Sequence, residues 1–116
     1  MTSKSLPPAR RLRRRGEFKR VFDAGRRAHG RYLTIIAMPA EGSRTRLGIV
    51  ASRKIGGAVA RNRAKRLIRQ VFRTELDPAL ASDLVVIPKQ ALVTVGAADV
   101  ATDYRATLKR LGLSRR

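Results

Sequence analysis

The 116-residue sequence has no cysteine, no tryptophan and one histidine, His29. Without cysteine there is no disulfide, no thiolate metal site and no cysteine nucleophile, and one histidine cannot build a multi-histidine metal site. Ser–His catalysis through His29 would need a nucleophile motif such as G-x-S-x-G, which the sequence lacks. No stretch approaches the roughly 18 consecutive apolar residues of a membrane span. The basic N-terminus also lacks the apolar segment of a secretory signal. The sequence therefore lacks the catalytic residues that most enzyme classes use.

Acidic residues are scarce and unevenly placed. The chain has 27 Lys and Arg against 8 Asp and Glu, which gives a formal net charge of +19. Residues 1–73 carry 21 basic and 3 acidic residues, whereas residues 74–116 carry 6 and 5. This polarity favours a polyanionic partner, because each phosphate that a cation neutralises releases counterions. A membrane surface fits less well, since no basic segment is paired with a broad Trp, Phe and Leu face.

The length suits one domain, and its core must be mostly aliphatic because only five residues are aromatic. We expect a single nucleic-acid-binding domain at residues 13–112, after a flexible basic arm at residues 1–12 and before a basic tail at residues 113–116. Hydrophobic periodicity predicts helices at residues 17–24, 59–76 and 97–111.

Runs of β-branched and apolar residues predict strands at residues 32–38, 45–52 and 83–88, followed by a loop or short extension at residues 90–96. The first two strands are expected to pair as a hairpin. The strand–helix–strand passage from residue 45 to 88 fits a parallel crossover, for which a right-handed connection is the default.

The helix predicted over residues 59–76 has apolar residues on one arc and cations on the opposite arc. No acidic residue occurs from Arg53 to Arg73. Such cations repel one another on a free helix by a few tenths of a kcal/mol per pair, and phosphates would offset this. We interpret the arc as a nucleic-acid surface; the alternative is a solvated basic face. Its polar residues are Arg61, Asn62, Lys65, Arg66, Arg69 and Arg73, with Arg63 between the arcs.

Phe18 and Phe22 in the first predicted helix allow two interpretations. They are either core residues that seal the helix against the sheet, or platforms on which single-stranded bases stack for about 1–3 kcal/mol per base. The cations beside them would attract the phosphates of such a strand, and they are Arg14, Arg15, Lys19 and Arg20.

From residue 52 to 69 the sequence reads SRKIGGAVARNRAKRLIR. This spaced pattern, with its Arg-Asn-Arg core followed by Lys-Arg and a further Arg, resembles the signature of the protein subunit of bacterial ribonuclease P. The segment FKRVF at residues 18–22, followed by Gly25, resembles the first helix of that family. The resemblance covers residues 10–111.

The resemblance implies an α+β fold: a two-layer α-β sandwich with about four strands in a mixed sheet, three helices and a left-handed βαβ crossover. It implies an RNA-binding subunit of a bacterial, cytoplasmic ribonucleoprotein that removes the 5′ leader from precursor tRNA by endonucleolytic phosphodiester hydrolysis. The RNA subunit would be catalytic and would use Mg²⁺. The protein would promote leader binding and metal affinity, with no catalytic residue, metal or cofactor of its own.

The partners implied are the catalytic RNA and the precursor tRNA leader, with no membrane and no obligate protein partner. Residues expected at the catalytic RNA or nearby phosphates are Arg53, Lys54, Arg61, Asn62, Arg63, Lys65, Arg66 and Arg69, to which the basic arc adds Arg73. Residues expected at the leader are Phe18, Phe22, Arg14, Arg15 and Lys19. The family often has an aromatic residue in its first strand, where this sequence has Tyr32 at the start and Ile35-Ile36 in the middle.

Three alternatives stay open from the residues alone. A ribosomal or other structural RNA-binding protein would share the basic polarity. A sequence-independent DNA binder would bind duplex DNA as well as structured RNA. A protein-only nuclease would need a cluster of carboxylates, which in this sequence are scattered singly.

Overall fold

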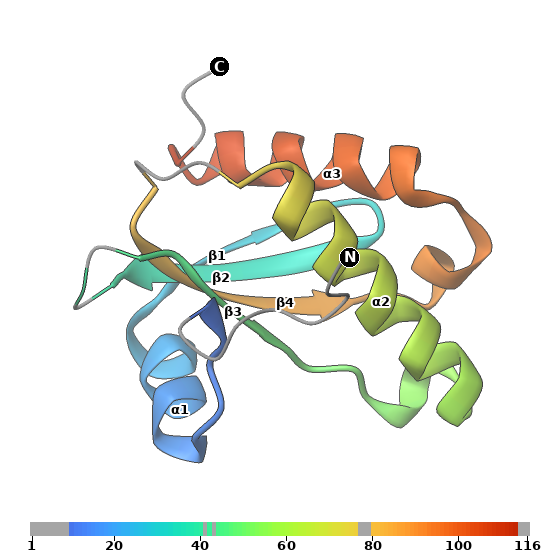
Figure 1. The fold of residues 1–116 in the computed structure, drawn as a ribbon, viewed down its shortest axis with the longest axis horizontal. Helices are drawn as coiled ribbons and strands as arrows, with labels where there is room; N and C mark the ends of the chain where they lie inside the picture. The colour runs from blue at the N-terminus through green and yellow to red at the C-terminus, as the bar shows by residue number, and fades with distance from the viewer. Residues whose placement is uncertain (1–9, 41, 43, 77–79, 114–116) are drawn as a thin grey trace, which may run out of the picture.

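The structure, a computed structural model, describes residues 10–40, 42, 44–76 and 80–113. The elements follow one another as α1 (Arg15–Ala24), β1 (Arg26–His29), β2 (Leu33–Pro39), β3 (Arg46–Ile49), the 3₁₀ helix η2 (Arg53–Ile55), α2 (Ala58–Thr74), β4 (Ser82–Pro88), the 3₁₀ helix η3 (Gln90–Thr94) and α3 (Ala97–Arg110). In Figure 1, α2 and α3 lie across one face of the sheet, and α1 lies away from them. The predicted α+β class, with three α-helices and a four-stranded mixed sheet, is confirmed.

The strand order is β1-β2-β4-β3, so the predicted hairpin between residues 32–38 and 45–52 is wrong. β4 lies between these strands, antiparallel to β2 and parallel to β3. The apolar run of β4 is buried on both faces, which suits a central strand, whereas the four-residue β3 takes an edge. Residues 26–29, which were not predicted as a strand, form the other edge through an antiparallel pairing of β1 with β2.

The predicted parallel crossover is present as β3–α2–β4. In Figure 1, β3 and β4 both run from left to right, β4 lies above β3, and α2 crosses in front of the sheet. This arrangement makes the connection left-handed, as the family resemblance implied and contrary to the general default.

The core has two parts because side chains alternate along the strands. On the β2 strand, Leu33, Ile35 and Ala37 belong to the large cluster under α2 and α3, whereas Ile36 belongs to a smaller cluster with α1. The predicted apolar arc of α2 faces the large cluster: Ala60 packs against it, and its buried members are Ala64, Leu67, Ile68, Val71 and Phe72. α1 and α2 therefore pack on opposite faces of the sheet, so the predicted two-layer arrangement is wrong: the sheet lies between α1 and the layer of α2 and α3.

Part of the predicted N-terminal arm is packed against the domain. Leu12 is buried in the smaller cluster, and its N–H donates to the Leu47 carbonyl at 2.9 Å. Arg11 also forms a parallel bridge with Leu47. Residues 10–12 thus belong with β3 rather than with a flexible arm. Residues 1–9 of that arm and residues 114–116 of the predicted tail lie outside the described residues.

Candidate nucleic-acid interface

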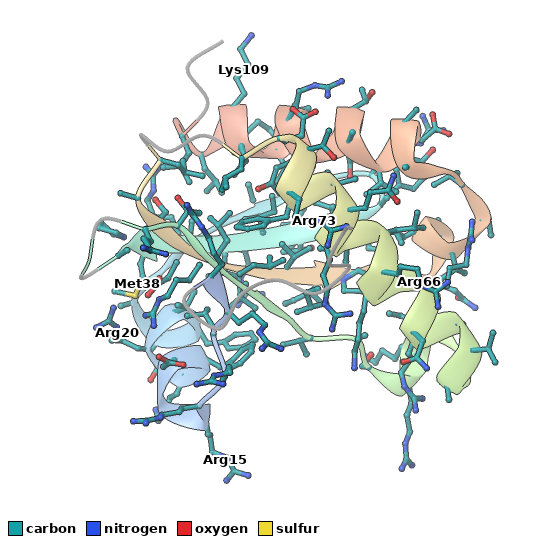
Figure 2. The ribbon with its side chains drawn as sticks, in the orientation of Figure 1. Arg15, Arg20, Met38, Arg66, Arg73 and Lys109 are labelled. Atoms are coloured by element: carbon teal, nitrogen blue, oxygen red, sulfur yellow. The ribbon has the colours of Figure 1, made fainter. Side chains whose placement is uncertain are left out.

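The predicted RNA-binding residues of α2 lie on the side of the helix away from the sheet. Asn62, Arg66, Arg69 and Arg73 are spaced three or four residues apart and so form one stripe along it. Asn62, Arg66 and Arg73 are exposed, and Arg69 is half-buried. Figure 2 shows Arg66 and Arg73 along this helix, well apart from Arg15 and Arg20 on α1. The helix itself contains no acidic residue to neutralise the stripe.

Two other cations of this set also have structural roles. The Arg63 guanidinium donates to the carbonyls of Val93 at 3.1 Å and Val95 at 3.2 Å, and so ties α2 to η3. Arg61 donates to the carbonyl of Gly56 at 3.1 Å, just before the helix begins. Charge reversal at Arg63 would therefore loosen η3 as well as remove a cation, which the sequence pattern did not indicate.

Arg53 and Lys54 are exposed on η2, immediately before α2. Two interactions hold this turn: the Lys54 N–H donates to the Ser52 hydroxyl at 3.3 Å, and Ile55 is buried in the large core cluster. Gly56 follows at a φ of 142°, a conformation that L side chains rarely adopt. The turn thus presents two cations beside the first turn of α2.

The two phenylalanines of α1 separate into different environments. Phe18 packs into the smaller core cluster, where a Cβ at Gly48 would lie 2.5 Å from its ring. The absence of a side chain at Gly48 therefore lets the ring reach the sheet. Phe22 is 37% exposed and is one of the exposed large hydrophobic residues. Of the two, Phe22 is the ring that is open to a ligand.

Of the predicted cations beside these rings, Arg14, Arg15 and Lys19 are exposed, and Arg20 is half-buried. Arg14 precedes the first turn of α1 and Arg15 begins it. Lys19 forms an ion pair with Asp23 at 2.6 Å, and the hydrogen bond to Asp23 raises the pKa of Lys19. Because α1 and α2 lie on opposite faces of the sheet, the structure does not join the predicted leader residues and the α2 stripe into one surface.

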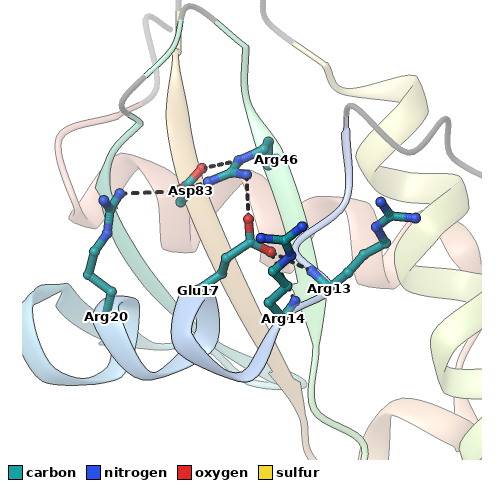
Figure 3. Close-up of polar contacts among 6 residues, drawn as sticks. All are labelled: Arg13, Arg14, Glu17, Arg20, Arg46 and Asp83. Atoms are coloured by element: carbon teal, nitrogen blue, oxygen red, sulfur yellow. Dashed lines mark hydrogen bonds and ion pairs between the residues drawn. The ribbon is translucent and has the colours of Figure 1, made fainter.

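An ion-pair network fixes α1 to the sheet (Figure 3). The Arg46 guanidinium on β3 donates to both carboxylate oxygens of Asp83 at 2.9 Å and to Glu17 at 2.8 Å. Arg20 on α1 also reaches Asp83, at 3.5 Å. The Asp83 carboxylate is almost fully buried. Sequence analysis missed this network because its members are 29 or more residues apart, except for the two on α1.

Glu17 also completes the start of α1. One oxygen of its carboxylate accepts the N–H groups of Arg14 at 3.0 Å and Arg13 at 2.8 Å. These two amide hydrogen bonds, assisted by Arg46, lower the pKa of Glu17 to about 2 from its ordinary value of 4.5. The charged form is thus favoured by folding.

We predict an acid-dependent loss of stability that arises from Glu17. The depressed pKa means that its contribution is fully present above about pH 4.5 and is lost as the pH falls toward 2. Glu17→Gln should be less stable than the wild type at pH 7, and the two thermal unfolding midpoints should converge as the pH falls through this window. If the two midpoints stay equally far apart at every pH, the charge of Glu17 is not the source of its stabilising effect.

No group of three or more potential metal-ligating His, Asp or Glu side chains occurs in the part of the chain that the structure describes. Within the same part, no helix is long and apolar enough to span a membrane.

Known proteins share both the sequence pattern and the fold of this chain. A sequence-family model described as Ribonuclease P matches residues 6–112. The chain belongs to the ribonuclease P protein family. A ribonuclease P protein component from Citrifermentans bemidjiense is 32% identical over 111 residues, which are 96% of each chain. One from Desulfovibrio desulfuricans is 37% identical over 115 residues, covering 96% of this chain and 85% of the relative.

Solved structures of the family share the fold. The Staphylococcus aureus RNase P protein superposes with a TM-score of 0.80 at 28% identity, over 90% of this chain and 96% of that one. The Thermotoga maritima RNase P protein gives 0.75 at 33% identity, over 86% and 96%. The chain is thus a ribonuclease P protein subunit, which acts in tRNA 5′ maturation with an RNA partner. The comparisons give no support to the ribosomal alternative.

Proposed function

We propose that the chain binds the catalytic RNA of ribonuclease P through α2 and η2, and the 5′ leader of precursor tRNA through α1. The observation that carries the first part is the stripe of cations on α2, which has no carboxylate on its helix. Such a surface lowers the repulsion between RNA strands and binds phosphates without reading a base sequence. The bacterial cytoplasm, where tRNA is made, is the expected compartment.

The chemistry of leader removal is assigned to the RNA. The described carboxylates include Glu17 and Asp83, which hold Arg46, and Asp103, whose two oxygens accept main-chain N–H groups. These groups are engaged in structural contacts and do not fit a resident Mg²⁺ site or a general base. Mg²⁺ held by the RNA would activate the attacking water.

Reconstitution tests the proposal. The purified chain is mixed with a bacterial ribonuclease P RNA and a precursor tRNA at a low Mg²⁺ concentration, at which the RNA alone is slow. We expect leader removal in the mixture and no cleavage by the chain alone. Cleavage by the chain without RNA would overturn the assignment of the chemistry.

Phe22 and Phe18 should respond differently to alanine. Phe22→Ala removes an exposed ring and should weaken binding of a leader-containing precursor about tenfold, since stacking is worth about 1–3 kcal/mol per base. Phe18→Ala opens a cavity beside Gly48 and should lower the free energy of unfolding by roughly 3 kcal/mol.

As controls, binding of mature tRNA and thermal unfolding are measured for both variants. Phe22→Ala should leave both unchanged. If Phe22→Ala only lowers the melting temperature and binds the precursor normally, Phe22 is a packing residue and the leader lies elsewhere.

A further inference from the structure

A second group of cations lies at the sheet edge opposite β3. β1 forms this edge, beside β2, and α3 packs along it. Five exposed cations come from β1, the turn after it, the residue after β4 and the end of α3. We call them the β1-edge surface: Arg26, Arg27, Arg31, Lys89 and Arg110. None of them was among the RNA-binding residues predicted from the sequence.

Main-chain carbonyls hold three of these five cations in place. Arg110 donates to the His29 carbonyl at 2.6 Å, and Lys89 donates to the carbonyl of the next residue, Gly30. Arg26 donates to the carbonyl of Leu111, one residue beyond Arg110. Three cations from three separate segments are therefore anchored at the carbonyls of His29, Gly30 and Leu111. A cation held in place loses less conformational entropy when it binds a ligand.

No cation of this surface forms an ion pair with a carboxylate of the described residues. The ion pairs found among those residues involve Lys19, Arg20, Arg46 and Arg105, and none includes a cation of the β1-edge surface. Asp103 is the acidic residue that contacts this region, but it is buried. Its two oxygens accept the N–H groups of Arg31 at 2.8 Å and Tyr32 at 2.7 Å.

Structural explanations cover only part of this arrangement. A cation in the last turn of a helix interacts favourably with the helix dipole, which accounts for Arg110. Charged residues on an edge strand prevent strand-to-strand aggregation, which accounts for Arg26 and Arg27. Neither reason requires that Lys89, from the far end of β4, be drawn to the same place. A cluster of like charges is favoured when a polyanion binds it.

We propose that the β1-edge surface is a second RNA contact, which binds the phosphodiester backbone and is separate from α2. This inference rests on the proposed function. In the sheet order, β1 lies at one edge and β3, from which the chain leads into α2, lies at the other. The two basic surfaces therefore contact different RNA segments. Arg31, whose guanidinium lies 5.6 Å from the centre of the Tyr32 ring, adds a planar cation suited to phosphate.

The test compares two variants with the same net charge. Arg27→Gln/Arg31→Gln removes two charges from the β1-edge surface without touching the carbonyl-bound cations. Arg44→Gln/Arg105→Gln removes two exposed charges elsewhere, one before β3 and one on the outer side of α3. Affinities of the full chain for a ribonuclease P RNA, and of the holoenzyme for a precursor tRNA, are measured over a salt series. Thermal unfolding checks that both variants are folded.

We expect the β1-edge variant to bind one of these RNAs about tenfold more weakly than the control variant, with the dependence of log affinity on log salt smaller by roughly 1–2. A loss confined to the ribonuclease P RNA assigns the surface to the catalytic subunit. A loss confined to the precursor assigns it to the substrate. Equal binding of the two variants to both RNAs overturns the proposal.

A third variant separates this proposal from the proposed function. Arg66→Glu/Arg69→Glu alters the α2 stripe and leaves the β1-edge surface intact. If this variant loses RNA affinity while the β1-edge variant behaves like its control, the second contact does not exist but the proposed function stands. If the wild-type chain fails to bind the ribonuclease P RNA, both proposals fail.

Discussion

Replacement of Asp83 by alanine should lower the free energy of unfolding by roughly 3 kcal/mol, because it leaves a half-buried guanidinium without its main partner. The Asp83 side chain is 2% exposed, and Arg46 donates to both of its oxygens at 2.9 Å. After the substitution, Arg46 would retain only Glu17. For a domain of this size the melting temperature should fall by about 10 °C, which circular dichroism would measure.

Asp23→Ala is the matched control. It also removes one aspartate that pairs with a cation, but both Asp23 and Lys19 are well exposed, so the change should stay within about 0.5 kcal/mol. Similar melting temperatures for Asp23→Ala and Asp83→Ala would mean that the buried network does not stabilise the fold.

Asp83→Ala should also affect the two proposed RNA contacts unequally. The Asp83–Arg46–Glu17 network holds α1 against the sheet, whereas α2 packs on the opposite face. At a temperature where Asp83→Ala remains folded, binding of a leader-containing precursor should weaken several-fold more than binding of the ribonuclease P RNA. Equal losses for both RNAs would indicate general loosening of the domain.

The sequence predicted the elements whose hydrophobic pattern is long and regular. The helix expected at residues 59–76 is found at Ala58–Thr74, and that expected at residues 97–111 is found at Ala97–Arg110. The apolar run at residues 83–88 is found as β4. In each case the side chains that repeat with the period of the element are the ones that the core buries, so local pattern and tertiary packing agree.

Strand pairing could not be derived from the same patterns. Whether β2 pairs with β3 or with β4 depends on which of them is better suited to the central position, where both faces of a strand are buried. That depends on all the strands together and not on the local pattern of one. β1 has the sequence RRAH, in which only Ala28 is apolar, so it carries almost no strand signal. It forms because β2 provides a hydrogen-bonding edge and Asp103 holds the following turn.

The candidate site was predictable as a set of residues but not as an arrangement. Spacing alone could not distinguish Phe18 from Phe22, because the difference depends on the space above Gly48, which lies 30 residues after Phe18. The role of Arg63 at the η3 carbonyls was hidden for the same reason. Charge patterning located the α2 stripe, whereas the β1-edge surface combines cations that are far apart in the sequence.

The largest expected effect on function comes from reversing the charge of the α2 stripe. Arg66→Glu/Arg69→Glu places two carboxylates where the proposal puts RNA phosphates, and no hydrogen bond from either guanidinium to the rest of the described chain was found. Unlike Arg63, these residues can therefore be changed with little effect on η3. We expect affinity for the ribonuclease P RNA to fall about 100-fold at physiological salt, with the salt dependence reduced by roughly 2.

Arg44→Glu/Arg105→Glu provides the same change in net charge on other exposed parts of the domain. If RNA binding responded only to net charge, both variants would lose affinity equally, and α2 would have no special role. A loss confined to the α2 variant requires that phosphates lie against that stripe, because screening at physiological salt limits the effect of a distant charge to about 8 Å. Thermal unfolding of both variants near the wild-type temperature would exclude misfolding as the cause.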